Sequence, residues 1–272
     1  MSGQIAFIGG GNMASAIIQG LMRQGSAAPE TISVVEPWQE ARDRLRQQFG
    51  IIAQAAPGPF LAKAATVVWA VKPQIFKDAA TPVAPHTGSA LHLSVAAGIP
   101  SGSIARWLGN EQVVRSMPNT PALIGKGITA LYAREGIDAQ QKSRIEQIIR
   151  STGELLWVDS EDQLDAVTAL SGSGPAYVFF FLEAMTEAGQ QMGLTREQAY
   201  QLAVATFAGA SELARSSDEP PQVLRQRVTS KGGTTHAAIT SMEASQMGSL
   251  FQQAMLAARD RAREMGQEFG GA

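Results

Sequence analysis

The sequence predicts an α/β fold in which a doubly wound parallel sheet is followed by an all-α domain. Up to about residue 160, short runs rich in valine and isoleucine alternate with polar, helix-like segments, which is typical of a parallel sheet covered by helices on both faces. After Asp159 no β-branched run of strand length recurs, and the remaining segments have the composition and spacing of helices. We therefore divide the chain into an α/β domain, residues 1–160, and a helical domain, residues 161–272.

The predicted elements follow this division in chain order. The strands are expected at residues 5–8, 32–35, 66–71, 91–97, 113–117, 127–132 and 154–158. The helices of the first domain are expected at residues 13–23, 39–49, 101–107 and 139–150. Those of the second domain are expected at residues 161–169, 174–192, 195–216, 219–228, 235–244 and 247–268. Small residues at 203–214 would let helices approach closely, but the helix propensity of alanine explains them equally well, so a helix-swapped dimer stays open on this feature alone.

Composition and charge exclude several classes of protein. The net charge of −2 provides no basic field for nucleic acid or for an anionic membrane surface. No apolar stretch approaches the roughly 18 residues of a membrane span, and the N-terminus lacks the basic region of a signal peptide, so we expect a cytoplasmic protein. The absence of cysteine excludes disulfides and a thiolate nucleophile, and no spacing of His, Asp and Glu suggests a metal site.

The first predicted strand ends in a glycine motif, Gly9-x-Gly11-x-x-Ala14, which leads into a helix. In a Rossmann-like site the first glycine makes the tight turn, the second lets the backbone approach a pyrophosphate, and the third position packs helix against strand. The N–H groups at the start of the helix then bind the phosphates. The motif therefore predicts a dinucleotide site, with a generic strand–turn–helix as the alternative.

The second predicted strand ends at Glu36, roughly 20 residues downstream, where an acidic residue usually binds the adenosine ribose. A carboxylate there accepts hydrogen bonds from the 2′-hydroxyl and repels a 2′-phosphate, which favours NADH over NADPH. Arg42 and Arg44 follow closely and could bind a 2′-phosphate, although a solvated helix face also explains them. The cofactor is therefore NADPH or NADH.

Three further loops follow strands at the carboxyl edge of the sheet, where ligands bind in open α/β folds. They are WAVKPQ at 69–74, SVAAG at 94–98 and RSMPNTP at 115–121. Pro73 stiffens the first loop beside Lys72. Asn119, held between two prolines, could orient the carboxamide of a nicotinamide ring. Ordinary loops are the alternative for each.

The stretch LSGSGPAYVFFFLEAM, 170–185, joins a Ser/Gly tract to an apolar helix. We interpret it as a helix start, with Ser173 as N-cap and Pro175 in the first turn. Glycines would leave the N–H groups open, which predicts a site for a small carboxylate. A well-capped core helix is the alternative, and the lack of Gly-Lys-Ser/Thr excludes a P-loop.

A second stretch, VTSKGGTTHAAI at 228–239, repeats this design. Thr234 and Thr235 supply N–H and hydroxyl groups to a ligand. Neither hydroxyl titrates near neutrality, so neither is a strong acid.

Five motifs in this order and spacing resemble the pyrroline-5-carboxylate reductase family: FIGGGNMA, AVKPQ, RSMPNTP, DAVTALSGSGPAY and TSKGGTT. The resemblance spans residues 5 to about 260. It implies NAD(P)H-dependent reduction of L-1-pyrroline-5-carboxylate to L-proline, the last step of proline biosynthesis. It also implies a homodimer formed by interlocked helical domains, which in many members assembles further into a ring of five dimers.

The resemblance assigns roles by position. Cofactor contacts are expected at Ile8, Gly9, Gly11, Asn12, Met13, Ala70, Val71, Lys72 and Pro73, to which the carboxyl-edge reading adds Glu36, Ala97, Gly98 and Asn119. Substrate contacts are expected at Ser171, Ser173, Gly174, Ser230, Gly232, Gly233, Thr234 and Thr235, and at Asp218, where the family usually has Glu. Thr235 is the catalytic candidate. The chain departs from the family at Lys231, usually Pro, and at Glu36, usually a small polar residue.

The reaction requires a hydride at the imine carbon of the ring, which becomes C5 of proline, and a proton on the ring nitrogen. We expect Thr235 to hydrogen-bond this nitrogen as an orienting group, unless the imine binds already protonated and needs no acid. Rival acids are His86, His92 and His236, of which only His236 adjoins the loop. Other functions stay open: a related imine reductase, a hydroxyacid dehydrogenase, which would need a Lys or His that residues 165–177 lack, and a sensor that binds NAD(P) without turnover.

Overall fold

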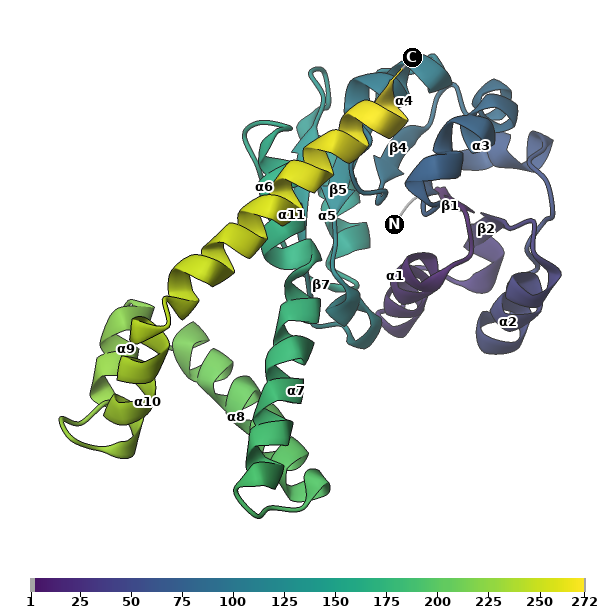
Figure 1. The fold of residues 1–272 in the computed structure, drawn as a ribbon. Coiled ribbons are helices and arrows are strands. Elements are labelled where there is room, and N and C mark those ends of the chain that lie inside the picture. Colours follow the sequence, from purple (N-terminus) through teal and green to yellow (C-terminus); the bar gives the residue numbers. More distant parts are fainter. Residues whose placement is uncertain (1–2, 272) are drawn as a thin grey trace. The chain divides into compact units, whose positions relative to one another are not determined.

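The computed structural model describes residues 3–271, which form two compact units (Figure 1). The first unit contains the described residues up to Ser173 together with those from Ala258 onward. The second unit is the helical segment Gly174–Ala257. The division into residues 1–160 and 161–272 stays a prediction.

The first unit is built on a seven-stranded sheet with the order β2-β1-β3-β4-β5-β6-β7. The strands are β1 (Gln4–Ile8), β2 (Ile32–Val35), β3 (Ala64–Trp69), β4 (Leu91–Ser94), β5 (Val113–Met117), β6 (Gly127–Ala133) and β7 (Gly153–Trp157). The doubly wound fold class is confirmed. The strands expected at 66–71 and 91–97 end earlier, at Trp69 and Ser94, because the chain leaves the ladder for the carboxyl-edge loops.

The sheet is mostly, rather than wholly, parallel. The first five strands pair in parallel, whereas β6 runs antiparallel to β5 and β7 runs parallel to β6. Only a short 3₁₀ helix, Thr120–Ile124, connects β5 to β6. This connection is too short for a crossover, which takes a dozen or more residues, so the chain has to return in the opposite direction.

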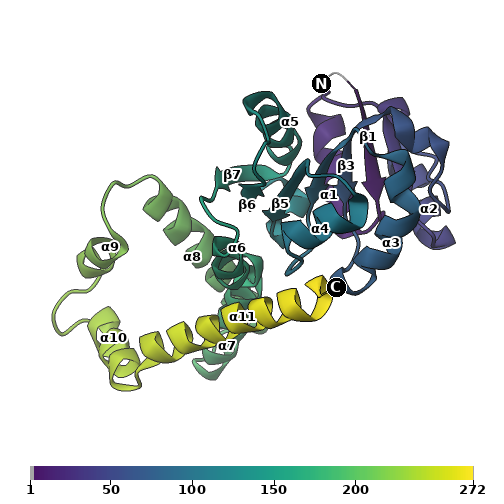
Figure 2. The ribbon, with the colours of Figure 1, turned by 90° about the horizontal axis from the view of Figure 1, so that it is seen from above.

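Helices cover both sides of the sheet (Figure 2). They are α1 (Asn12–Arg23), α2 (Gln39–Phe49), α3 (Phe76–Val83), α4 (Ser101–Leu108), α5 (Ala139–Ile149) and α6 (Gln163–Val167). Successive side chains of β1 enter different cores: Phe7 joins Ile18 of α1 in one, and Ala6 joins Phe76 of α3 in the other. The sequence reading missed α3, because Pro82 lies inside it and disguises the helical pattern.

His92 lies on β4 with none of its surface exposed. Its Nδ1 accepts a hydrogen bond of 3.0 Å from Nε1 of Trp69, so the neutral ring carries its proton on Nε2. Burial lowers the pKa of His92 to about 4. The side chain is therefore a neutral part of the core, as expected from its place in an apolar strand.

This burial predicts a pH-dependent stability. Because the unfolded state binds a proton near pH 6.5 and the folded state only near pH 4, the His92 contribution is complete above pH 6.5 and is lost as the pH falls to 4. The loss should approach about 3 kcal/mol of unfolding free energy. Urea titrations of the parent and of His92→Gln, whose oxygen still accepts from Trp69, should diverge over this interval. A His236→Gln control should follow the parent; a parent curve parallel to that of His92→Gln would contradict the account.

The second unit is wholly helical. Its helices are α7 (Gly174–Gln191), α8 (Arg196–Arg215), α9 (Pro221–Arg227), α10 (Thr234–Ala244) and the part of α11 (Met247–Gly270) that ends at Ala257. Thr195 and Gln198 cap α8 reciprocally, as in a capping box. Large apolar side chains of this unit stay exposed, among them Phe179, Phe180, Tyr200, Leu202, Leu213 and Leu250. An apolar surface of this extent is typical of an interaction face.

Candidate functional site

The glycine motif forms an open turn between β1 and α1. Gly9 has φ of +95°, and a β-carbon there would lie 2.6 Å from the carbonyl oxygen of Ala70, so only glycine fits. Gly11 is exposed, and a β-carbon added to it would meet nothing within 4 Å. Gly11 also precedes α1 as its N-cap and offers no side chain to the helix. The first N–H groups of α1 are thus open to a phosphate.

Glu36 locks the end of β2 to the glycine turn. Its carboxylate is buried and accepts hydrogen bonds from the N–H of Gly10, at 2.8 Å, and of Trp38, at 2.9 Å. Arg42 donates instead to the carbonyl oxygens of Glu36, at 2.8 Å, and Pro37, at 2.6 Å, and to the side chain of Gln39. The carboxylate therefore faces the turn, while the Arg42 guanidinium is engaged with its own loop.

The other predicted cofactor residues of this unit also follow strand ends. Ala70 donates from its N–H to the carbonyl of Ile8 at 2.8 Å, which brings the β3 loop to the glycine turn. Lys72 is exposed beside Pro73, and Gly98 adopts φ of +78° in the loop after β4. The predicted set Ile8, Gly9, Gly11, Asn12, Met13, Glu36, Ala70, Val71, Lys72, Pro73, Ala97, Gly98 and Asn119 thus lies at or just after the carboxyl ends of β1 to β5.

Asn119 is already partly engaged. Its Oδ1 accepts a hydrogen bond of 3.0 Å from the N–H of Ile128 at the start of β6. The side-chain amide is therefore held by the start of β6. Its role toward a nicotinamide stays a prediction.

The prediction that Ser173 caps a new helix is wrong. The chain passes from α6 through a π-helical turn, Thr168–Gly172, into α7. Ser173 has helical torsion angles, φ −83° and ψ −17°, and its N–H donates to the carbonyl of Thr168 at 2.8 Å. The tract is thus a π-helical turn that comes directly before α7, and Ser173 does not have the extended torsion angles of an N-cap. A π-turn has no sequence signature of its own, although such turns are frequent at functional sites.

The glycines and serines of this tract have other structural roles. A β-carbon on Gly172 would lie 2.3 Å from Cε of Met117, so this glycine makes room for β5. Ser171 donates from its hydroxyl to the carbonyl of Val167 at 3.2 Å. The hydroxyls of Ser171 and Ser173 are what the tract can offer a ligand, and substrate binding by them and Gly174 stays a prediction.

The open helix start lies in the second unit, at α10. Gly232 takes φ of +77°, and Gly233 donates from its N–H to the carbonyl of Ser230 at 3.0 Å. Gly233 is the N-cap of α10 and provides no side-chain cap. Within the described chain, the N–H groups of Thr234 and Thr235 have no hydrogen-bond partner, so they can bind an anion.

The remaining candidate site residues are described by their exposure and by their contacts with the 230–235 loop. Asp218 is exposed in the turn between α8 and α9, and among the described residues no hydrogen bond or ion pair joins it to the 230–235 loop. His236 is exposed as the third residue of α10, while His86 is half-buried in the first unit. Lys231 is exposed in the loop itself.

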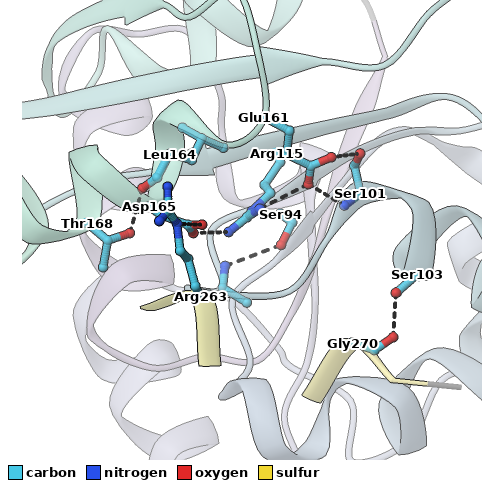
Figure 3. Close-up of polar contacts among 11 residues, drawn as sticks. Ser94, Ser101, Ser103, Arg115, Glu161, Leu164, Asp165, Thr168, Arg263 and Gly270 are labelled. Carbon is cyan, nitrogen blue, oxygen red and sulfur yellow. Dashed lines mark hydrogen bonds and ion pairs between the residues drawn. The ribbon is translucent and has the colours of Figure 1, made fainter. Parts of the chain in front are cut away.

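Sequence reasoning missed a cluster of charged side chains, formed by Arg115, Glu161, Asp165 and Arg263, close to the start of α4 (Figure 3). Arg115, buried on β5, contacts the carboxylates of Glu161 at 3.0 Å and Asp165 at 3.9 Å. Asp165 also lies 3.9 Å from Arg263 of α11. Burial raises the pKa of Asp165, against the opposing effect of the two arginines. The available signal was a single arginine inside the otherwise uncharged strand VVRSM.

The described residues contain neither a candidate metal site nor a candidate membrane span. Residues 3–271 contain no group of His, Asp and Glu side chains that could hold a metal ion. No helix in the same range has the length and apolar character needed to cross a membrane.

Two family models match the chain. The model for pyrroline-5-carboxylate reductase dimerisation matches residues 161–265. The model for coenzyme F420-dependent NADP oxidoreductases matches residues 4–98. The first match covers the helical segment, and the second covers the glycine turn and the first four strands.

Curated relatives and solved structures match nearly the full length. The pyrroline-5-carboxylate reductase of Pseudomonas aeruginosa is 44% identical, with 98% of each chain covered. That of Arabidopsis thaliana is 33% identical, over 97% of this chain and 96% of its own. The enzyme from Coxiella burnetii superposes with a TM-score of 0.90 at 39% identity, covering 97% of this chain and 99% of its own. The Plasmodium falciparum enzyme, solved with NADP bound, gives 0.88 at 28% identity, covering 97% and 98%.

Proposed function

The chain belongs to the pyrroline-5-carboxylate reductase family and reduces L-1-pyrroline-5-carboxylate to L-proline with NAD(P)H, and on this premise we propose which residues bind the dinucleotide and which bind the substrate. The glycine turn and the carboxyl edge of the sheet hold the dinucleotide, and the start of α10 holds the substrate. The observation that carries this proposal is the pair of uncapped helix starts, at α1 and at α10, each preceded by glycine.

The glycine turn fits the pyrophosphate of a dinucleotide. Any side chain on Gly9 would strike Ala70, and the open space above Gly11 is what close backbone approach requires. Glu36 would accept hydrogen bonds from the adenosine ribose, and Ala97, Gly98 and Asn119 would border the nicotinamide. When bound, the dinucleotide supplies the hydride, while the protein supplies position and electrostatics.

The start of α10 would bind the substrate carboxylate. The N–H groups of Thr234 and Thr235 are unpaired donors at the positive end of the helix dipole, and Gly232 and Gly233 keep side chains away from them. In this position the Thr235 hydroxyl can donate a hydrogen bond to the ring nitrogen. It orients the imine and need not lose a proton itself, so alignment of the reactants provides much of the rate.

The substrate tract at residues 171–174 has a revised role in this proposal. The N–H of Ser173 is used by the carbonyl of Thr168, so at this position the tract offers a ligand its hydroxyl rather than its N–H. Substrate binding by the hydroxyls of this tract stays a prediction. Asp218 and Ser230 stay predicted substrate contacts on the strength of the family pattern alone.

The oligomeric assembly is inferred from the helical segment of the chain. The match to the dimerisation model, together with exposed apolar side chains such as Phe179 and Phe180, supports an oligomer formed through this segment. We propose a homodimer as the basic unit. A ring of five dimers and a cytoplasmic location stay predictions, and light scattering at several protein concentrations would distinguish a dimer from a decamer.

Turnover measurements test the proposed function against its rivals. Loss of nicotinamide absorbance with racemic 1-pyrroline-5-carboxylate, and none with 2-hydroxyacids and oxidised dinucleotide, is the expected pattern. A cyclic imine without the carboxylate, 1-pyrroline, should show a KM raised at least 100-fold, because the α10 donors would lose their partner. Equal KM values would contradict the carboxylate site, and dinucleotide binding without turnover would support the sensor.

A further inference from the structure

The loop between β4 and α4, residues 95–100, is anchored at its end by a distant carboxylate. Glu161 accepts hydrogen bonds from the N–H and the hydroxyl of Ser101, the first residue of α4, each at 2.6 Å (Figure 3). A charged acceptor on a helix start makes stronger hydrogen bonds than a neutral one. The position of Glu161 therefore sets the position of the last residues of the loop.

Glu161 is in turn held by the interior of the sheet. Nη1 of Arg115 lies 3.0 Å from its Oε1, and Arg115 is almost wholly buried on β5. A buried guanidinium needs a charged partner, since an unpaired charge in the interior is very costly. Asp165 lies farther from Arg115, at 3.9 Å, and is shared with Arg263. Arg115 and Glu161 thus form a fixed support between β5 and the start of α4.

The same loop is confined on another side by the C-terminal part of α11, which belongs to the same unit. Gly98 takes φ of +78°. A β-carbon added to Gly266 of α11 would lie 2.8 Å from the carbonyl oxygen of Gly98. Farther along, the hydroxyl of Ser103 donates to the carbonyl of Gly270 at 2.6 Å. These close contacts leave the loop little freedom to shift toward α11.

We propose that Glu161, supported by Arg115, is a positioning residue for hydride transfer, acting through Ser101 on the loop that carries Ala97 and Gly98. The inference rests on the proposed function, in which this loop borders the nicotinamide. Hydride transfer requires reacting atoms about 3–3.5 Å apart, and a displacement of about 1 Å can slow a reaction by about 100-fold. Loss of the anchor should therefore slow the chemical step more than it weakens dinucleotide binding.

The test compares Glu161→Gln with the control Glu111→Gln. Both changes remove a carboxylate paired with an arginine, but Glu111 pairs with Arg134 and, among the described contacts, accepts no hydrogen bond from Ser101. For Glu161→Gln we expect kcat to fall about tenfold, the NADH dissociation constant to change less than about twofold, and the isotope effect with 4-deuterated NADH to rise. The control should match the parent in all three quantities.

A second variant covers the case in which Glu161→Gln does not fold. Ser101→Ala removes one hydrogen bond to Glu161 and leaves its ion pair with Arg115 intact, and it should show the same pattern with a smaller decrease in kcat. A lower melting temperature with unchanged kcat and isotope effect in either folded variant would overturn the proposal, because Glu161 would then serve stability alone. Failure of the proposed function itself would appear differently, as absence of turnover in the parent protein.

Discussion

Replacing Thr235 by Val is expected to lower kcat/KM for pyrroline-5-carboxylate roughly 100-fold, while the dissociation constant for NADH stays within about twofold. Valine keeps the shape of the side chain but removes the hydroxyl that orients the ring nitrogen. A hydrogen bond to a charged or developing charged group contributes about 1.5–3 kcal/mol, and a 100-fold effect corresponds to about 2.7 kcal/mol. Steady-state kinetics with each substrate varied in turn measure the change.

Two companion variants make the Thr235 result specific. Thr235→Ser keeps the hydroxyl and should retain most of the activity. Thr240→Val makes the same substitution later in α10, outside the loop, and should behave as the parent. Parent-like kinetics for Thr235→Val would remove this residue from the mechanism and leave a substrate that binds already protonated.

Replacing Glu36 by Ser is expected to shift the ratio of kcat/KM for NADH over NADPH about 100-fold toward NADPH. The parent should prefer NADH, because the buried carboxylate faces the glycine turn and would repel a 2′-phosphate there. Serine removes this charge and frees the N–H groups of Gly10 and Trp38, which now donate to Glu36 and could bind a phosphate.

A matched control for the cofactor prediction is available at Glu40, four residues after Glu36. Glu40→Ser removes one exposed negative charge in the first turn of α2 and should leave the ratio unchanged. A parent that prefers NADPH would contradict the role given to Glu36. In that case Arg44, exposed on α2, becomes the candidate for the 2′-phosphate.

Local patterns were sufficient for most of the fold. The strands Ile32–Val35 and Val113–Met117 and the helix Gln39–Phe49 have the predicted bounds, because apolar runs and helix breakers delimit them in the sequence itself. The direction of β6 depends on the length of the preceding connection and on strand pairing, which no local pattern records. The helix α3 was missed for a similar reason, since its proline is tolerated only in its structural context.

Those parts of the candidate site that are formed by a single short segment could be predicted from the sequence. The glycine turn and the start of α10 each lie within a few consecutive residues, so residue types and spacing identify them. The π-turn at Thr168–Gly172 resembled a helix start, because glycine and serine are typical of helix starts and a π-turn has no sequence signature that would distinguish it. The anchoring of Ser101 by Glu161 joins residues 60 positions apart in sequence, and only the three-dimensional structure reveals it.

The central claim is that the open start of α10, rather than the tract at residues 171–174, binds the substrate carboxylate. A crystal structure of the protein with oxidised dinucleotide and L-proline tests it most directly. We predict that the proline carboxylate accepts hydrogen bonds from the N–H groups of Thr234 and Thr235. A carboxylate held by Ser171 and Ser173 instead, with the start of α10 left unpaired, would contradict the account.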